Sequence, residues 1–273
     1  MGLFEALFLG LLQGLTEFLP ISSSGHLVIV ETFLKLDVEK LKIFDVMLHL
    51  GSLSAIIIYF WKDFMGLVKG FLAFLRLYKT NPHIQIYQKL IGFLIVATIP
   101  AVIIGLLFGD SIDYLFRNVW YIGIFMIIVG EVFILAEKAL AKYKVKKEIG
   151  LKQALIIGCA QALALAPGIS RSGSTISAGL FLGIPREKAA RFSFLMAIPA
   201  IIGAGVLTGV KDLTAGDFNF EIATMLVGFL ASLLASFAAV YFLMRFLKNN
   251  TLRPFAYYLF VVGGLMIAVN LLW

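Results

Sequence analysis

The sequence predicts an all-α polytopic membrane protein with an inverted-topology repeat, in which each half is a re-entrant helical hairpin plus three transmembrane helices. Hydrophobic residues make up 61% of the 273 residues and charged residues only 14%, whereas a soluble domain is about 45–50% apolar and about 25% charged. The apolar runs are continuous over about 20 residues rather than alternating, which favours spanning helices over a closed β-barrel. An internal repeat indicates two related halves.

The repeat relates residues 3–27 to residues 151–175. The first copy reads LFEALFLGLLQGLTEFLPISSSGHL and the second LKQALIIGCAQALALAPGISRSGST; an offset of 148 aligns them without a gap, and ten of 25 positions are identical. In both copies an apolar stretch is interrupted by a short tip of Ser, Gly and Pro. Repeats of this kind in membrane proteins place broken helices where two halves meet near the bilayer midplane.

The predicted spans are 43–60, 90–109, 118–137, 189–210, 220–244 and 254–273. The loops rich in Lys and Arg are 61–89, 138–152, 186–191 and 245–253, whereas the short loops 110–117 and 211–221 are acidic. Lys and Arg concentrate in cytoplasmic loops, so the basic loops are assigned to that side. The long, aromatic and basic loop 61–84 is also suited to an interfacial helix.

This alternation predicts how the two copies of the repeat are inserted. Both ends of the second copy lie on the cytoplasmic side, so it enters and returns there as a hairpin tipped by Pro167–Gly173. The first copy enters and returns from outside, with its tip at Pro20–Gly25. The halves therefore have opposite orientation, and both termini are predicted to lie outside.

The chain is predicted to form one membrane domain, residues 1–273, with repeat halves 1–137 and 151–273 and a basic linker 138–150. The opening MGLFEALFLG has neither a basic n-region nor a small-residue cleavage site, so no removable signal peptide is expected. The net charge of +7 reflects the basic loops and does not indicate nucleic-acid binding.

Metal and disulfide chemistry based on Cys and His is not supported. Cys159 is the single cysteine, which excludes an internal disulfide and a Cys-based metal cluster. The three histidines, His26, His49 and His83, are scattered without the spacing of a zinc site.

The two tips are suited to binding an anion. Free N–H groups near helix ends and the positive end of the helix dipole point at a tip of this kind, and Ser and Gly allow close approach. Small residues at the tips would also let two hairpins pack closely without any ligand, and this alternative stays open.

The first tip carries ionisable residues. Gln13 and Glu17 are four residues apart and share a helix face, Glu17 stands just before the serine tip, and His26 follows it. Ionisable side chains are costly within a membrane, so those that occur there generally belong to a binding site or to a pathway for substrate, ions or protons. The alternative is that Glu17 only links helices and that His26 is a structural histidine.

The second tip carries Arg171 at the position aligned with Ser23. A pseudo-twofold axis would bring these two residues face to face. A planar guanidinium beside hydroxyls and free N–H groups fits a phosphate well, because it offers paired donors and a fixed charge. The alternative is that Arg171 serves only as the counter-ion of Glu17.

Other polar residues within the spans give weaker signals. Asp45 and His49 are four apart and could line the same cavity or bond each other, and Glu131 could hydrogen-bond a neighbour. Pro100 and Pro199 are expected to kink their spans. No chemistry is assigned to these five residues.

The motifs at the tips resemble those of the bacterial undecaprenyl pyrophosphate phosphatase family, also known as bacitracin resistance proteins. The first motif reads QGLTE over residues 13–17, followed by FLPISSSGH over residues 18–26. The second reads PGISRSGST over residues 167–175. The resemblance extends over the whole chain and its span pattern. Gln13 stands where many members carry Glu, which leaves one carboxylate in the first motif.

The resemblance implies a bacterial plasma (inner) membrane protein with an active site facing the outside or periplasm. It implies hydrolysis of undecaprenyl pyrophosphate to the monophosphate carrier and phosphate, which recycles the carrier lipid for cell-wall synthesis. It also implies that Ser23 is the nucleophile or orients the substrate, and that Glu17, His26 and Arg171 are essential. The residues expected to bind substrate are Gln13, Ser22, Ser24, Gly168, Ser170, Ser172 and Thr175.

The family resemblance further implies a divalent cation, Mg²⁺ or Ca²⁺, with Glu17 as a candidate ligand. The expected partners are the polyprenyl pyrophosphate lipid and membrane lipid, with no nucleic acid. The sequence does not determine the oligomeric state, so a homodimer stays open.

Two other functions would account for parts of this sequence pattern. A transporter would also use inverted repeats with broken helices. Transport does not, however, require Glu17, Ser23 and His26, which occur in the first copy of the repeat and not in the second. The phosphatidic-acid-phosphatase type of lipid phosphatase is suggested by Ser24-Gly25-His26, yet it needs a His downstream of its Ser-Arg pair. No His follows Ser170-Arg171, so the sequence does not match that type of phosphatase.

Overall fold

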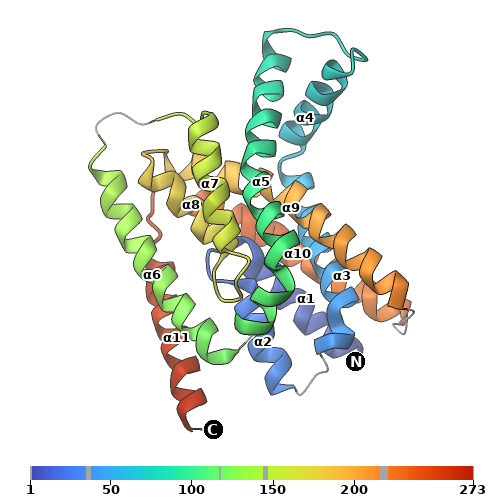
Figure 1. Ribbon diagram of the computed structural model, residues 1–273, viewed down its shortest axis with the longest axis vertical. Helices are drawn as coiled ribbons and strands as arrows, with labels where there is room; N and C mark the ends of the chain where they lie inside the picture. Colours follow the sequence, from blue (N-terminus) through green and yellow to red (C-terminus); the bar gives the residue numbers. More distant parts are fainter. Residues whose placement is uncertain (1, 35–37, 117, 144–146, 216–220, 273) are drawn as a thin grey trace.

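The computed structural model describes residues 2–34, 38–116, 118–143, 147–215 and 221–272, and these residues are helical with no strand among them (Figure 1). The helices in chain order are α1 (Leu3–Phe18), α2 (Ser23–Phe33), α3 (Val38–Tyr59), α4 (Trp61–Phe74), α5 (Pro82–Phe116), α6 (Val119–Ala141), α7 (Leu151–Leu163), α8 (Arg171–Phe181), α9 (Arg186–Ala215), α10 (Ile222–Phe246) and α11 (Arg253–Leu272). The prediction of an all-α polytopic fold is confirmed. Parts of the predicted linker 138–150 and of the loops 110–117 and 211–221 lie outside the described residues.

Five of these helices, α5, α6, α9, α10 and α11, are long and apolar enough to cross a membrane. The predicted span 43–60 falls in α3, which meets the same test only together with α4, across a bend of 89°. Helix α9 begins at Arg186, inside the predicted basic loop 186–191. Its charged first turns are stabilised by ion pairs of Arg186 with Glu137 and of Arg191 with Asp63.

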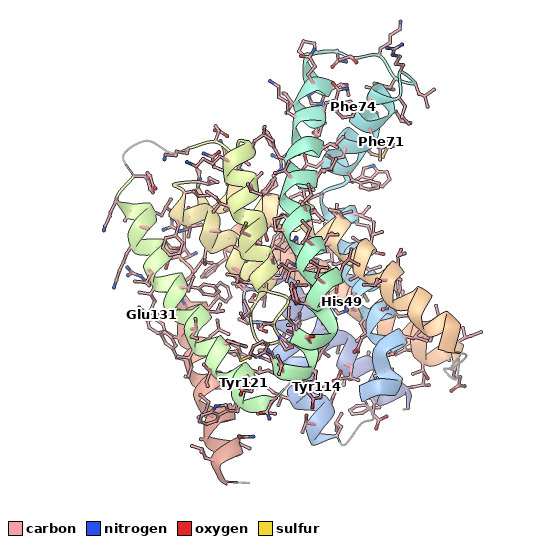
Figure 2. The ribbon with its side chains drawn as sticks, viewed as in Figure 1. His49, Phe71, Phe74, Tyr114, Tyr121 and Glu131 are labelled. Carbon is pink, nitrogen blue, oxygen red and sulfur yellow. The ribbon has the colours of Figure 1, made fainter. Side chains whose placement is uncertain are left out.

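The predicted basic loop 61–89 is largely helical. Helix α4 packs against the N-terminal part of α5, and the two form an arm that projects from the body of the molecule (Figure 1). The helices approach closely at Gly66, where an added Cβ would lie 2.3 Å from the Tyr87 ring. Figure 2 shows Phe71 and Phe74 on this arm, away from the centre of the molecule.

Each copy of the repeat forms a pair of short helices joined by a tip, α1 with α2 and α7 with α8. The tips have matching local structure, because the serine before each second helix caps it. The Ser22 hydroxyl accepts from the Gly25 N–H at 3.3 Å, and the Ser170 hydroxyl accepts from the Gly173 N–H at 3.1 Å. Serine is a favoured N-cap residue for this reason. Helix capping thus explains the identity of Ser22 with Ser170 between the copies.

The first helix of each hairpin packs against a span of the other half, α1 on α10 and α7 on α5. Both contacts occur at the same repeat position. A Cβ on Gly10 would lie 2.5 Å from the Gly228 carbonyl oxygen, and one on Gly158 would lie 2.3 Å from the Ala97 carbonyl oxygen. Such small residues let membrane helices pack backbone to backbone. The opposite insertion of the halves in the bilayer stays a prediction.

Candidate active site

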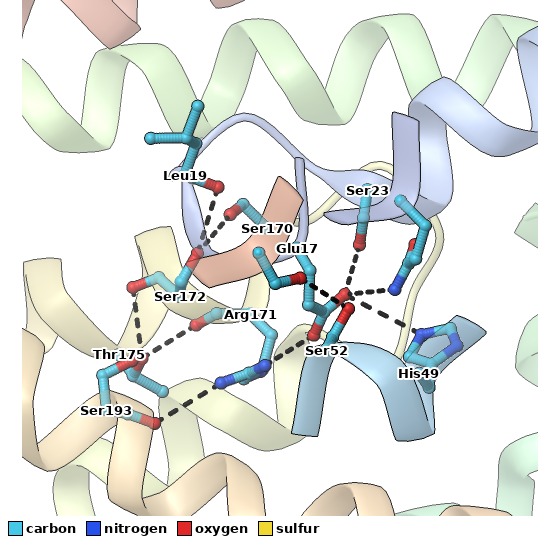
Figure 3. A network of polar contacts seen from close by, with 12 residues as sticks. Glu17, Leu19, Ser23, His49, Ser52, Ser170, Arg171, Ser172, Thr175 and Ser193 are labelled. Carbon is cyan, nitrogen blue, oxygen red and sulfur yellow. Dashed lines mark hydrogen bonds and ion pairs between the residues drawn. The ribbon is translucent and has the colours of Figure 1, made fainter. Parts of the chain in front are cut away.

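The Glu17 carboxylate is the centre of a polar network between the two tips (Figure 3). Glu17 lies in the last turn of α1 and is 8% exposed. Its Oε2 accepts hydrogen bonds from the Ser23 hydroxyl at 2.7 Å and from the Gln13 amide at 3.0 Å. Its Oε1 accepts from Arg171 Nη2 at 2.5 Å. A buried carboxylate is stable only when it is paired and hydrogen-bonded in this way.

Arg171 is the first residue of α8, and Ser23 is the first residue of α2. The alignment of the two positions therefore holds in the helices themselves. Arg171 Nη1 also donates to the Ser193 carbonyl oxygen on α9 at 3.4 Å, and its guanidinium lies 5.7 Å from the Phe18 ring centroid. Ser23 and Arg171 do not simply face each other, because Glu17 stands between them and binds both.

Further contacts hold the tips together. The Gly168 N–H donates to the Ser24 hydroxyl at 3.5 Å, and the Ser172 hydroxyl donates to the Leu19 carbonyl oxygen at 3.3 Å. Gly168 has φ +94°, and a Cβ there would lie 2.8 Å from Ile122 Cα. Glycine is therefore required at this position by both conformation and space.

The backbone of the first tip is strained, and the equivalent backbone of the second is not. Ser22 has φ 70° and ψ 90°, whereas Ser170 has φ −62° and ψ 119°. A positive φ in a residue with a side chain costs about 1–3 kcal/mol and persists where the surrounding structure imposes it. The strain immediately precedes Ser23, the residue that bonds Glu17.

A pocket of about 150 Å³ opens over this network. It is lined by both tips and by α3, through Glu17, Ser22, Ser23, Ser24, His49, Ala164, Ile169, Ser170 and Arg171. Pockets for drug-sized ligands are about 300–1,000 Å³. The smaller volume here suits a phosphate group, and it leaves a long apolar tail outside the pocket.

His49 is the histidine of this pocket. Its Nδ1 lies 2.7 Å from the Asp45 carbonyl oxygen, and since a carbonyl only accepts, Nδ1 carries the proton. The other ring nitrogen, Nε2, lies 3.8 Å from Glu17 Oε2. From the sequence, His49 was expected to line the same cavity or to bond Asp45, without a role in the chemistry. Its position inside an apolar span was the signal that could have indicated a functional residue.

His26, expected from the family resemblance to be essential, is directed away from the pocket. Its Nδ1 donates to the Ser22 carbonyl oxygen at 2.8 Å, and its Nε2 accepts from the Tyr258 hydroxyl at 2.7 Å. The two rings are stacked, with centroids 5.7 Å apart. His26 therefore connects the strained Ser22 backbone to α11. Tyr258 was not anticipated from the sequence.

Three residues expected to bind substrate are fully enclosed or nearly so and hold the network in place. Gln13 donates to Glu17. The Thr175 hydroxyl lies 2.8 Å from the Arg171 carbonyl oxygen and 2.7 Å from the Ser193 hydroxyl. Ser172 bonds the first tip at Leu19. These side chains support the residues that line the pocket and are not part of its lining.

Beneath the pocket, a serine network fixes α1 against α3 and α10. The Ser52 hydroxyl lies 2.9 Å from those of Ser232 and Ser236, and Ser236 donates to the Gly14 carbonyl oxygen at 3.2 Å. Ser52 is visible beside Glu17 in Figure 3. Such interhelical bonds stabilise helix packing in a membrane by about 0.6 kcal/mol each.

The described residues contain no group of three or more His, Cys, Asp or Glu side chains that could hold a metal ion. Glu17 is the single carboxylate in the pocket lining, next to serine hydroxyls. Mg²⁺ is commonly bound by one or two carboxylates together with substrate phosphates. The donor set therefore fits a cation that is bound mainly by a phosphorylated substrate, and not a preformed protein cage.

The fold and the site define a polytopic helical membrane protein with a polar pocket between two hairpin tips. Residues 6–265 match the family model described as bacitracin resistance protein BacA, and the chain belongs to that family. An undecaprenyl-diphosphatase of Methanosphaera stadtmanae is 41% identical over 273 residues, covering 97% of each chain. One of Rubrobacter xylanophilus is 41% identical, covering 99% of each chain, and one of Caldicellulosiruptor bescii is 40% identical, covering 98% of each.

Proposed function

We propose that this protein is an integral membrane phosphatase that hydrolyses undecaprenyl pyrophosphate to undecaprenyl phosphate and inorganic phosphate, recycling the lipid carrier of cell-wall synthesis. The family and its undecaprenyl-diphosphatase relatives support this function. The observation that carries it is the pairing of a serine hydroxyl and an arginine on one buried carboxylate. The Ser23 hydroxyl donates to Glu17 Oε2 at 2.7 Å, and Arg171 binds Oε1 at 2.5 Å.

In the first step, Ser23 Oγ attacks the terminal phosphorus and its proton passes to Glu17, to which it already donates. The bond between that phosphorus and the bridging oxygen breaks, and undecaprenyl phosphate leaves with the electron pair. A serine hydroxyl needs such an adjacent base to act as a nucleophile. Arg171 and the tip N–H groups stabilise the charge on the transferred phosphoryl group.

In the second step, water attacks the phosphoserine. One water proton passes to His49 Nε2, the ring nitrogen that is not bonded to the Asp45 carbonyl oxygen. Glu17 returns its proton to Ser23 Oγ, phosphate is released, and His49 loses its proton to solvent. His26 acts as a positioning residue, because its ring nitrogens are engaged by the Ser22 carbonyl oxygen and the Tyr258 hydroxyl.

Glu17 and the tip serines would bind a divalent cation, Mg²⁺ or Ca²⁺, that accompanies the diphosphate. When bound, the cation would neutralise phosphate charge. The proposed arrangement places the pocket on the outer side of the plasma membrane, with both termini outside. This orientation is supported by the basic loops assigned to the cytoplasm.

The test is phosphate release by the purified full chain in detergent, without an ion gradient. Ser23→Ala is expected to lower turnover by at least about 10³-fold, comparable to the loss of a catalytic nucleophile in other hydrolases. Ser54→Ala is the matched control, since that hydroxyl donates to the Leu50 carbonyl oxygen of its own helix and Ser54 is not among the residues that line the pocket. Translocation of lipid in sealed liposomes without phosphate release would favour a transporter and overturn the proposal.

A further inference from the structure

A second, larger pocket of about 410 Å³ lies between α5, α9 and the segment before α7. Its lining residues are His83, Ile86, Tyr87, Lys89, Leu90, Phe93, Glu148, Ile149, Lys188, Arg191, Phe192 and Leu195. None of them lines the pocket around Glu17. Its volume falls in the range of small-molecule sites, about 300–1,000 Å³.

Three cations line this pocket against a single carboxylate. Arg191 is already engaged, because it forks onto the buried Asp63, which also accepts from the Tyr87 hydroxyl at 3.4 Å. Lys188 pairs with Glu148, but the two side chains are 51% and 79% exposed. An ion pair this exposed is worth about 0.2–1 kcal/mol and is easily exchanged.

Lys89 is the second available cation. It is exposed at the pocket and forms no ion pair with any residue that the structure describes. Lys89 and Lys188 come from the two helices that form the pocket walls, α5 and α9. An anionic group between them would therefore be bound from both sides.

The interior walls of the pocket are apolar. Phe93 lies one helical turn beyond Lys89 on α5, and Leu195 lies about two turns beyond Lys188 on α9. Ile86, at the edge of the pocket on α5, is 62% exposed although it is apolar. The pocket thus has cationic groups at the start of two spans and apolar groups further along them. This order matches a phospholipid, in which a charged headgroup is followed by apolar acyl chains.

The pocket lies at the end of the spans that carries the basic loops. Its residues come from the starts of α5 and α9 and from the segment preceding α7. Basic loops are typical of the cytoplasmic side, where the leaflet contains anionic lipids, and basic pockets between spans there bind anionic headgroups. A soluble anion would use the lysines but not the apolar walls.

We propose that this pocket binds one anionic phospholipid, with its phosphate between Lys89 and Lys188 and its acyl chains along Phe93 and Leu195. The site is separate from the phosphatase pocket and does not depend on the proposed hydrolysis. The bound lipid would contact both α5 and α9. Helix α9 also provides the Ser193 carbonyl oxygen that accepts from Arg171. It would stabilise the packing of these two helices.

The test compares the thermal stability of the purified full chain in a neutral detergent with phosphatidylglycerol, phosphatidylcholine, glycerol 3-phosphate or inorganic phosphate added. Affinity for phosphatidylglycerol is measured by native mass spectrometry. The variant is Lys89→Gln/Lys188→Gln, and the control is Lys138→Gln/Lys142→Gln, which removes the same charge at the end of α6. The single variants Lys89→Gln and Lys188→Gln provide milder changes should the double variant fold poorly.

Phosphatidylglycerol is expected to raise the melting temperature of the wild type and the control more than phosphatidylcholine does. The pocket double variant is expected to bind it about 30-fold more weakly, since each lysine near a lipid surface contributes about tenfold or less. Phosphate release in detergent stays at the wild-type level, which separates this site from catalysis. Equal affinity in the pocket and control variants, or an equal shift with either water-soluble phosphate, would overturn the proposal.

Discussion

Ser23 and Arg171 occupy equivalent positions in the two hairpins and hold opposite oxygens of the same carboxylate. Each is the first residue of a helix, α2 or α8. The Ser23 hydroxyl binds Glu17 Oε2, and the Arg171 guanidinium binds Oε1. At this aligned position the first tip carries a hydroxyl and the second a cation. Glu17, which comes from only one copy, holds the two side chains on the same carboxylate.

Arg171→Ala is expected to lower both stability and turnover. It leaves the Glu17 carboxylate buried without a counter-ion, which costs about 3–5 kcal/mol, and it removes a donor to the phosphoryl group, worth about 10²–10³-fold in rate. The double variant Glu17→Gln/Arg171→Ala is expected to regain much of the thermal stability but none of the turnover. Near-wild-type phosphate release by Arg171→Ala would contradict the assigned role.

His49→Gln is expected to slow the second step more than the first. In the proposed mechanism, transfer of the terminal phosphoryl group to Ser23 does not use His49, whereas attack of water on the phosphoserine does. The measurement is a rapid-quench experiment with substrate labelled in the terminal phosphate. The variant should show a burst of one undecaprenyl phosphate per protein and retain label on Ser23. Uniformly slow turnover without labelled protein would instead favour direct attack of water on the substrate.

Tyr258→Phe is expected to act on the site indirectly. It removes the donor to His26 Nε2 and leaves a largely buried ring nitrogen unpaired, at a cost of about 1–3 kcal/mol. Turnover should fall several-fold through the displaced Ser22 tip, with a lower melting temperature. Tyr257→Phe is the matched control, because Tyr257 is its exposed neighbour on α11. A loss of turnover as large as that of Ser23→Ala would show that the pair acts in the chemistry itself.

Gly158→Ala is expected to destabilise the fold. The added Cβ would lie 2.3 Å from the Ala97 carbonyl oxygen, and that backbone cannot move without displacing α5. Overpacking of this kind costs about 1–3 kcal/mol and should lower the melting temperature by several degrees. Gly264→Ala is the control, since no atom lies within 4 Å of its added Cβ. Equal melting temperatures of the two variants would show that α7 and α5 do not pack as described.

Long-range contacts account for the differences between prediction and structure. The histidine next to the serine motif, His26, bonds Tyr258, which is 232 residues away in the chain. His49 reaches the pocket because α3 packs beside α1. The rotation of each helix about its axis decides which side chain enters the pocket. That rotation depends on the packing of distant helices, so the sequence motif alone does not show which histidine lines the pocket.

Patterns within the sequence predicted the helical membrane fold, the two tips and the equivalence of Ser23 with Arg171, because hydropathy, helix capping and the repeat are properties of contiguous residues. The tertiary structure alone decided that Glu17 lies between those two residues, that His49 and not His26 lines the pocket, and that α4 and α5 form a projecting arm. These features arise from contacts between residues far apart in the chain, and no local pattern encodes them.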